Sequence, residues 1–235
     1  MRTGTAVLWV LTGGLGMGMA MAASGQPAPN TLTAEERAAG WRLLFDGTTT
    51  AGWRGFRQTA MPGGWAVVDG VLTRVGKGGD IVTEEEFSDF ELSFEWQIAP
   101  GGNSGVFFGV SETAKAVWHT APEYQILDNA GHKDGATPAT STGANYALHP
   151  PARNVARPAG QWNQSRIVVR GAHVEHWLNG ERIVEYELGS ADWKALVAAS
   201  KFQEHSAYGT VRPGRIALQD HGDRVAFRSI KIRTP

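Results

Sequence analysis

DFELSFEWQI, residues 89–98, decides the fold of this chain. Its apolar and polar residues alternate without a break from 90 to 98. The apolar positions are Phe90, Leu92, Phe94, Trp96 and Ile98, and the polar positions between them are Glu91, Ser93, Glu95 and Gln97. Because successive side chains of a strand point to opposite faces, this pattern predicts a long strand with one buried face and one polar face.

Shorter alternating runs follow the same rule along most of the chain. They lie at 64–74, 105–110, 123–127, 165–170, 173–178, 182–186, 215–219 and 225–232. Turn signals separate them, and the clearest is Asn179-Gly180, which predicts a two-residue type I′ hairpin. Helices are expected only after a cap at Thr33 and over 192–199. The pattern indicates an all-β fold, an antiparallel β-sandwich or jelly roll with one or two short helices.

The N-terminal residues predict export. Residues 1–22 carry one charged side chain, Arg2, then a short apolar run, and they end in Ala20-Met21-Ala22. Small residues at alternate positions before a polar stretch are typical of a secretory signal peptide, although an uncleaved membrane anchor is the alternative. We expect a linker over 23–33, a single β-sandwich domain over 34–235, and a periplasmic or secreted protein that has no membrane association after signal cleavage.

The composition restricts the partners. The 235-residue chain has 22 Lys+Arg, 23 Asp+Glu and no cysteine. It lacks the basic excess that attracts nucleic acid, so we expect no DNA or RNA partner. The absence of cysteine excludes disulfides, thiolate metal sites and a cysteine nucleophile. We expect no cofactor, while the sequence leaves a bound divalent cation and the oligomeric state open.

The stretch 129–158 is the one long region without clear periodicity. A loop of this length in a compact domain is usually functional, so we expect it to form a wall of a binding site. Asp128, His132 and Asp134 are suitable metal ligands by type. Such residues in a glycine-rich loop more often make turn and solvent contacts, and we therefore predict no metal site.

Two features point toward a carbohydrate ligand. Several strands carry Glu, Gln, Asn and His at their polar positions, and the chain has nine tryptophans, one of them within the predicted signal. Sugars require several hydrogen-bonding side chains and an aromatic surface for their C–H faces. Most of the tryptophans are nevertheless expected in the core, because aromatic side chains dominate such cores.

Carboxylates and histidines are the candidates for chemistry. A conventional glycosidase needs two carboxyl groups about 5–9.5 Å apart. Glu91 and Glu95 share a strand face but are about 13 Å apart, so they cannot be the pair alone, although Glu123 from another strand could complete one. His176 and His221 could instead act as an acid and a base, because histidine titrates near neutral pH; a structural role is the alternative for each.

Five segments together resemble the 3-keto-disaccharide hydrolase family, formerly a domain of unknown function. They are WRLLFDG (41–47), NSGVFFGV (103–110), EYQILDN (123–129), WNQSRIVVRGAHVEHWLNG (162–180) and GRIALQDHGDRVAFRSIKIR (214–233). The resemblance covers about 41 to 233, and the order of the segments makes it specific. It implies a concanavalin A-like sandwich that hydrolyses a glycoside already oxidised at C3 of one sugar ring.

The implied chemistry accounts for the missing carboxylate pair. A C3 ketone acidifies the C2 proton, so a single base can remove it; the C1 substituent is then expelled and water adds back. On this interpretation Glu123 or His221 is the base, and the other of the two or His176 is the acid. The residues expected around the sugar oxygens are Asn103, Gln125 and Gln219, and further candidates for substrate contacts are Asp128, Tyr146, Trp177 and Arg228.

Some alternatives stay open at this point. Family members often have an arginine shortly after the NSG segment, where this chain has Gly109; if that arginine binds substrate, the change implies a different sugar or leaving group. An ordinary glycoside hydrolase of the same fold and a non-catalytic carbohydrate-binding module also fit, since this sandwich serves lectins as well as enzymes. Convergence of Glu123, His176 and His221 on one face would favour catalysis.

Overall fold

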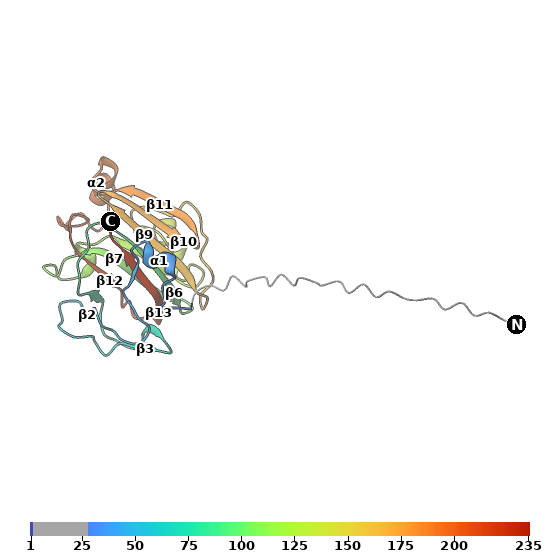
Figure 1. Ribbon diagram of the computed structural model, residues 1–235. Helices are drawn as coiled ribbons and strands as arrows, with labels where there is room; N and C mark the ends of the chain where they lie inside the picture. Colours follow the sequence, from blue (N-terminus) through green and yellow to red (C-terminus); the bar gives the residue numbers. More distant parts are fainter. Residues whose placement is uncertain (2–27) are drawn as a thin grey trace.

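A computed structural model describes Met1 and residues 28–235, and the chain from 28 onward forms two packed antiparallel sheets (Figure 1). This confirms the predicted β-sandwich. The predicted signal peptide and the start of the linker lie outside the described residues. Within the part of the chain that is described, no helix is long and apolar enough to cross a membrane.

The larger sheet, sheet A, has the order β11-β10-β9-β6-β13-β4-β3, and β1 also pairs with β13. Its strands are β11 (Glu181–Glu187), β10 (His173–Leu178), β9 (Asn163–Arg170), β6 (Phe90–Ile98), β13 (Val225–Arg233), β4 (Val71–Arg74), β3 (Trp65–Val68) and β1 (Arg42–Leu43). Sheet B has the order β2-β5-β12-β7-β8. Its strands are β2 (Trp53–Gly55), β5 (Ile81–Thr83), β12 (Arg215–Leu218), β7 (Asn103–Val110) and β8 (Glu123–Leu127).

The alternating runs predicted from sequence become strands of these sheets. The run at 89–98 is β6, and the runs at 123–127 and 173–178 match β8 and β10 at both ends. The run at 64–74 is the hairpin β3–β4. Asn179 and Gly180 have φ of 48° and 87°, as the predicted type I′ turn requires. Strands β1, β2 and β5 have only two or three residues, too few for a period to be recognised in the sequence.

The helices are short, as expected. In α1 (Ala34–Ala38) Thr33 and Glu36 form a reciprocal capping box, and α2 (Ala191–Ala198) is capped by the Ser190 hydroxyl. Single turns of 3₁₀ helix are η1 (Val117–His119), η2 (Lys133–Ala136) and η3 (Pro138–Thr140). The end of the expected linker packs on the domain, because Asn30 Oδ1 accepts from the Ser229 N–H and Asn30 Nδ2 donates to the Gly70 carbonyl.

The two sheets bury one apolar core between them. The rings of Phe94 in β6 and Tyr124 in β8 meet edge to face with centroids 5.8 Å apart. The hydroxyls of Tyr124 and Ser165 lie 2.8 Å apart, and Trp96 Nε1 donates to the same Ser165 Oγ at 2.8 Å. This buried, satisfied contact ties β8 to sheet A and keeps Tyr124 facing inward. The residues on either side of Tyr124 must therefore face outward.

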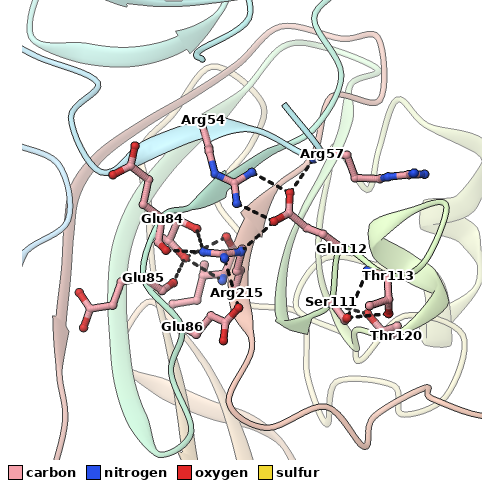
Figure 2. Close-up of polar contacts among 12 residues, drawn as sticks. Arg54, Arg57, Glu84, Glu85, Glu86, Ser111, Glu112, Thr113, Thr120 and Arg215 are labelled. Atoms are coloured by element: carbon pink, nitrogen blue, oxygen red, sulfur yellow. Dashed lines mark hydrogen bonds and ion pairs between the residues drawn. The ribbon is translucent and has the colours of Figure 1, made fainter. Parts of the chain in front are cut away.

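An ion-pair network fixes one end of sheet B (Figure 2). The Glu112 carboxylate accepts two hydrogen bonds from the Arg54 guanidinium, at 2.7 and 2.5 Å, and one from Arg215 Nε at 3.0 Å. It also accepts the Arg57 backbone N–H at 2.6 Å. These donors lower the pKa of Glu112 to about 2. The network joins β2, β12 and the end of β7, and none of its residues lines the pocket described next.

Candidate active site

The outward face of sheet B carries a polar patch across three neighbouring strands. Gly105 of β7 pairs with Gln125 of β8, and the Gln219 N–H donates to the Gly105 carbonyl at 3.0 Å. The core residues of these strands include Tyr124, Ile126, Val106 and Leu218. The alternation therefore turns Glu123, Gln125 and Gln219 outward, and with Asn103 they form the floor of a small pocket of about 150 Å³.

Four segments form the walls of this pocket. Trp118 comes from η1, Tyr146 from the 129–158 region, Lys201 from the chain after α2, and His221 from the turn after β12. The predicted site residues that the pocket brings together are Asn103, Glu123, Gln125, Tyr146, Gln219 and His221. The long loop thus contributes to the pocket, as its length suggested.

Glu123 is the carboxyl group of the pocket. Its side chain is buried, and no described residue makes a hydrogen bond with its carboxyl oxygens. Burial raises the pKa of Glu123 to about 8; the Lys201 charge opposes this rise and the Asp80 charge adds to it. At neutral pH the free protein therefore holds Glu123 mostly as the acid, and the carboxylate, once formed, is a stronger base than an exposed one.

Three amide oxygens around Glu123 are buried and have no partner among the described residues: Asn103 Oδ1, Gln125 Oε1 and Gln219 Oε1. A buried acceptor without a donor costs about 1–3 kcal/mol, so such groups are rare without a purpose. The Gln125 amide is oriented by its Nε2, which donates to the Thr140 carbonyl at 3.2 Å. Three converging acceptors suit a ligand rich in hydroxyl groups.

A second carboxyl group, Asp80, lies beside the patch. The register of β5 with β12 pairs Val82 with Ala217 and Ile81 with Leu218, so Asp80 continues the ladder next to Gln219. Its Oδ1 accepts the Asp220 N–H at 2.9 Å, and burial raises the pKa of Asp80 to about 6. Asp80 does not line the pocket, which contains Glu123 as its one carboxyl group among the described residues.

His176 does not reach the pocket. It is completely buried between the sheets, where its Nδ1 donates to the Gly143 carbonyl at 2.9 Å and its Nε2 faces the Tyr186 hydroxyl at 3.4 Å. Burial lowers the pKa of His176 to about 4, so the ring is neutral. Because the Gly143 N–H in turn donates to the Gln125 carbonyl, His176 supports the strand that carries the floor. It anchors the site from behind instead of meeting a ligand.

Trp177 and Arg228 also lie away from the pocket, on the outward face of sheet A. Trp177 stacks under Arg166 and Arg228 lies over Trp162. Glu91 and Glu95 share this face; Glu91 binds Arg170 and Arg233, and Glu95 binds Arg228. The expectation that Glu123 could complete a carboxylate pair with them is therefore wrong, because the two outward faces are on opposite sides of the sandwich.

The remaining candidates organise loops. Asp128 Oδ2 accepts the Gly101 N–H at 2.8 Å, and His132 Nδ1 accepts the Asp134 N–H at 3.1 Å, so these are turn contacts. Gly109 has a φ of 71° at an irregularity in the β7–β12 pairing, and a β-carbon there would lie 3.0 Å from the Val211 carbonyl oxygen. Gly109 does not line the pocket, so the departure expected there from the family pattern falls outside the Glu123 site.

The group with the best metal-ligand geometry in the described chain is elsewhere. Ligand atoms of His173, Glu175 and Glu185 lie within 4.8 Å of one another on the outward side of the β10–β11 hairpin. Arg182 pairs with both glutamates, at 3.4 and 3.0 Å, and places positive charge where a cation would sit. The group is an ion-pair cluster in this state, remote from Glu123.

Sequence reasoning missed Trp118 and Lys201, although both line the pocket. Neither lies in a strand or a regular helix, so no alternation could indicate which way its side chain points. The core tryptophans are fewer than expected: the buried ones are Trp53, Trp65, Trp96 and Trp193. The only indication of a role for Trp118 in the sequence was that it lies outside the alternating runs, where a core position is not expected.

Known proteins resemble the chain over almost all of the sandwich. Residues 40–233 match the family of 3-keto-alpha-glucoside-1,2-lyase-like domains. A 3-keto-disaccharide hydrolase of Bacteroides thetaiotaomicron is 33% identical over 226 residues, which cover 83% of this chain and 78% of that protein. Among solved structures, a proposed glycosyl hydrolase of Parabacteroides distasonis has a TM-score of 0.82 at 37% identity, covering 88% of this chain and 99% of the other. A second protein of that organism, also described as a proposed glycosyl hydrolase, has a TM-score of 0.65 at 27% identity, over 83% and 99%.

Proposed function

Since the chain belongs to the 3-keto-alpha-glucoside-1,2-lyase-like family, we propose that it cleaves the glycosidic bond of 3-keto-glycosides or 3-keto-disaccharides in the Glu123 pocket. The observation that carries the proposal is a pocket with one carboxyl group surrounded by unpaired amide oxygens. A substrate that already holds a ketone needs only one strong base at its C2 proton.

The proposed reaction begins at C2 of the keto sugar. The Glu123 carboxylate takes the C2 proton, and the electrons of the C2–H bond form a C2=C3 double bond while the C3 oxygen becomes an enolate. The C3 carbonyl then re-forms, a C1=C2 double bond appears, and the C1–O bond breaks with its electron pair leaving on the aglycone oxygen. His221, exposed at the rim, is the proposed donor of the proton that this oxygen needs.

Water completes the hydrolysis in this proposal. It adds its oxygen to C1 of the enone, and a proton returns to C2, so the net products are a 3-keto sugar and the free alcohol. Asn103, Gln125 and Gln219 are proposed to hold the sugar hydroxyls during both halves, which would supply the donors that their buried oxygens lack. The elimination across C1 and C2 agrees with the 1,2-lyase wording of the family description.

Two other functions are less well supported. An ordinary glycoside hydrolase needs a second carboxyl group facing the bond, and within the described lining of the pocket Glu123 stands alone. A binding module needs no acid or base, whereas burial here raises the pKa of Glu123 far above that of an exposed glutamate. A strongly perturbed carboxyl group in a polar pocket is typical of a reacting group.

The test is incubation with 3-keto-trehalose and 3-keto-lactose, beside their unoxidised parents, with release of 3-keto-glucose followed. We expect turnover of the keto substrates alone. Turnover of only the parents would contradict the proposal in favour of ordinary hydrolysis, and binding without turnover would leave a binding module. In deuterated water, exchange of the C2 proton during turnover is expected from elimination, whereas direct displacement predicts none.

Export is part of the same proposal and rests on residues 1–22 alone. We propose that the chain is cleaved after the Ala20-Met21-Ala22 segment and acts in the periplasm or the medium. N-terminal sequencing of the protein from cell fractions tests this. A mature protein that still begins at Met1 would contradict it.

A further inference from the structure

Lys201 is a positive charge held beside the pocket by aromatic rings. Its Nζ lies 4.4 Å from the ring centre of Tyr146, 5.3 Å from that of Phe202 and 5.5 Å from that of Trp118. Rings at these distances attract an ammonium group through their electron-rich faces. Two of the three rings belong to the walls of the pocket that Lys201 itself lines, so the charge is positioned at the pocket.

The N–H donors of the Lys201 ammonium group are not used by the described residues. In the part of the chain that the structure describes, Lys201 forms no ion pair with a carboxylate and donates no hydrogen bond to another residue, although an ammonium group has three N–H donors. Its charge is felt inside the pocket, because it opposes the rise in the pKa of Glu123. Lys201 is exposed, yet three aromatic rings lie beside its ammonium group at the edge of a pocket that holds a buried carboxyl group.

We propose that Lys201 is a catalytic residue whose ammonium group binds the C3 oxygen of the keto sugar and stabilises the enolate that forms there. This inference rests on the proposed function. When Glu123 takes the C2 proton, the electron pair of the C2–H bond moves into C2=C3 and the carbonyl pair moves onto the C3 oxygen. A donor that waits at that oxygen lowers the barrier, because the charge it meets develops only in the transition state.

The floor residues do not supply this charge. The side chains of Asn103, Gln125 and Gln219 are neutral amides: their buried oxygens accept hydrogen bonds from hydroxyls, and their NH2 groups donate without carrying a charge. His221 lies on the exposed rim, where the leaving oxygen needs a proton. Lys201 is thus the lysine of the pocket lining, and its ammonium group is the donor placed to meet the charge that develops on the C3 oxygen.

The closing experiment compares Lys201→Met and Lys201→Arg with the unchanged protein on 3-keto-trehalose. Methionine keeps an unbranched chain between the rings but removes the charge, whereas arginine keeps the charge. We expect Lys201→Met to lower kcat by about 10²–10³-fold with little change in KM, to slow C2 deuterium exchange by the same factor, and to move the pH profile set by Glu123 to higher pH. Lys201→Arg should recover most of the loss.

Lys194→Met, in which an exposed lysine of α2 is changed, is the matched control and should keep full activity.

The outcomes separate this inference from the function beneath it. If the unchanged protein turns over no 3-keto-disaccharide, the proposed function fails and the role of Lys201 fails with it. If it turns over the substrate and folded Lys201→Met keeps its kcat, only the Lys201 inference is overturned. A loss with Lys201→Arg as severe as with methionine also overturns it. Cyanoborohydride reduces imines to stable amines. If it traps a covalent sugar adduct on Lys201, the lysine reacts with the ketone through an imine, and the proposed ion contact is overturned.

Discussion

Glu123 lies across Gly105, the residue of β7 that pairs with Gln125. A β-carbon built on Gly105 would lie 2.9 Å from Cγ and 3.0 Å from Cδ of Glu123, and closer still to its Oε1. Contacts under 3.0 Å force one of the two groups to move, so a side chain at 105 requires the flexible Glu123 side chain to leave its present position. The glycine of the NSG segment is therefore part of the candidate site, although it carries no functional group.

Gly105→Ala should displace the Glu123 carboxyl group and reduce kcat/KM for a 3-keto-disaccharide by about 100-fold, because a misplacement of about 1 Å can cost that much. Thermal unfolding should change little by comparison. Gly63→Ala is the control, since a β-carbon at Gly63 meets nothing within 4 Å. Full activity in Gly105→Ala would show that Glu123 does not need this position to react.

The pH dependence of activity follows from the environment of Glu123. Burial raises the pKa of Glu123 to about 8, and a base must be ionised to accept a proton. We expect kcat/KM to rise with pH and to level off above an apparent pKa of about 8. A profile measured from pH 5 to 9.5 tests this assignment. Activity that falls between pH 6 and 8 would instead make Glu123 the acid.

The same pKa makes a prediction about stability. In the unfolded chain Glu123 ionises near pH 4.3, and its folded pKa is about 8, so folding is penalised as pH rises from about 4 to 8. Glu123→Gln removes this penalty while removing activity. Urea unfolding should show the variant to be more stable by roughly 2–4 kcal/mol above pH 8, and equal to the unchanged protein at pH 4. Equal stability at both pH values would mean that Glu123 is not desolvated in the folded protein.

The alternation of apolar and polar residues predicted which residues form the floor of the site. It could not predict to which sheet each polar strand face belongs. It correctly put Glu123 and Gln125 together, opposite Tyr124, because β8 keeps a strict period of two. The same rule put Glu91 and Glu95 on one strand face. The sequence alone does not show which sheet their strand joins, so it could not show that they face away from Glu123. His176 and Trp177 alternate as well, and polarity suggested that the histidine faces outward. Its hydrogen bond to Gly143, made by a loop 33 residues away, holds it inside instead.

The residues that form the walls of the pocket could not be predicted from local sequence patterns, for a related reason. Trp118 and Lys201 are 83 positions apart in the chain and meet only because η1 and the segment after α2 both cover the outward face of sheet B. Such contacts depend on the packing of irregular segments, for which neither period nor turn chemistry supplies a rule. Tyr146 was found only because the length of its loop suggested a function.

Gln219 should serve the ligand and not the fold. Its Oε1 is buried without a partner, so Gln219→Met removes an unpaired polar group and should leave the free energy of unfolding unchanged or raise it by up to about 1 kcal/mol. Binding of 3-keto-glucose should weaken about tenfold, as expected for one lost hydrogen bond. Calorimetric titration beside thermal unfolding separates the two effects, with the exposed Gln203→Met as control. Loss of stability without loss of binding would refute this role.

The Glu112 network predicts the opposite pattern, stability without a part in the chemistry (Figure 2). The pKa of Glu112 is lowered to about 2, chiefly by its hydrogen bonds with Arg54, so the stabilisation is complete above the unfolded pKa near 4.3 and is lost as pH falls toward 2. Glu112→Gln should reduce the free energy of unfolding by about 1–3 kcal/mol at pH 7, since charged hydrogen bonds with the arginines are lost, and by about half as much at pH 3, where the folded carboxyl group is still mostly ionised. Urea unfolding at both pH values measures this, with Glu85→Gln as the control, because the Glu85–Arg42 pair is exposed and contributes little. A loss of equal size at pH 3 and pH 7 would show that the amide disturbs packing and that the charge of Glu112 is not what holds this end of sheet B together.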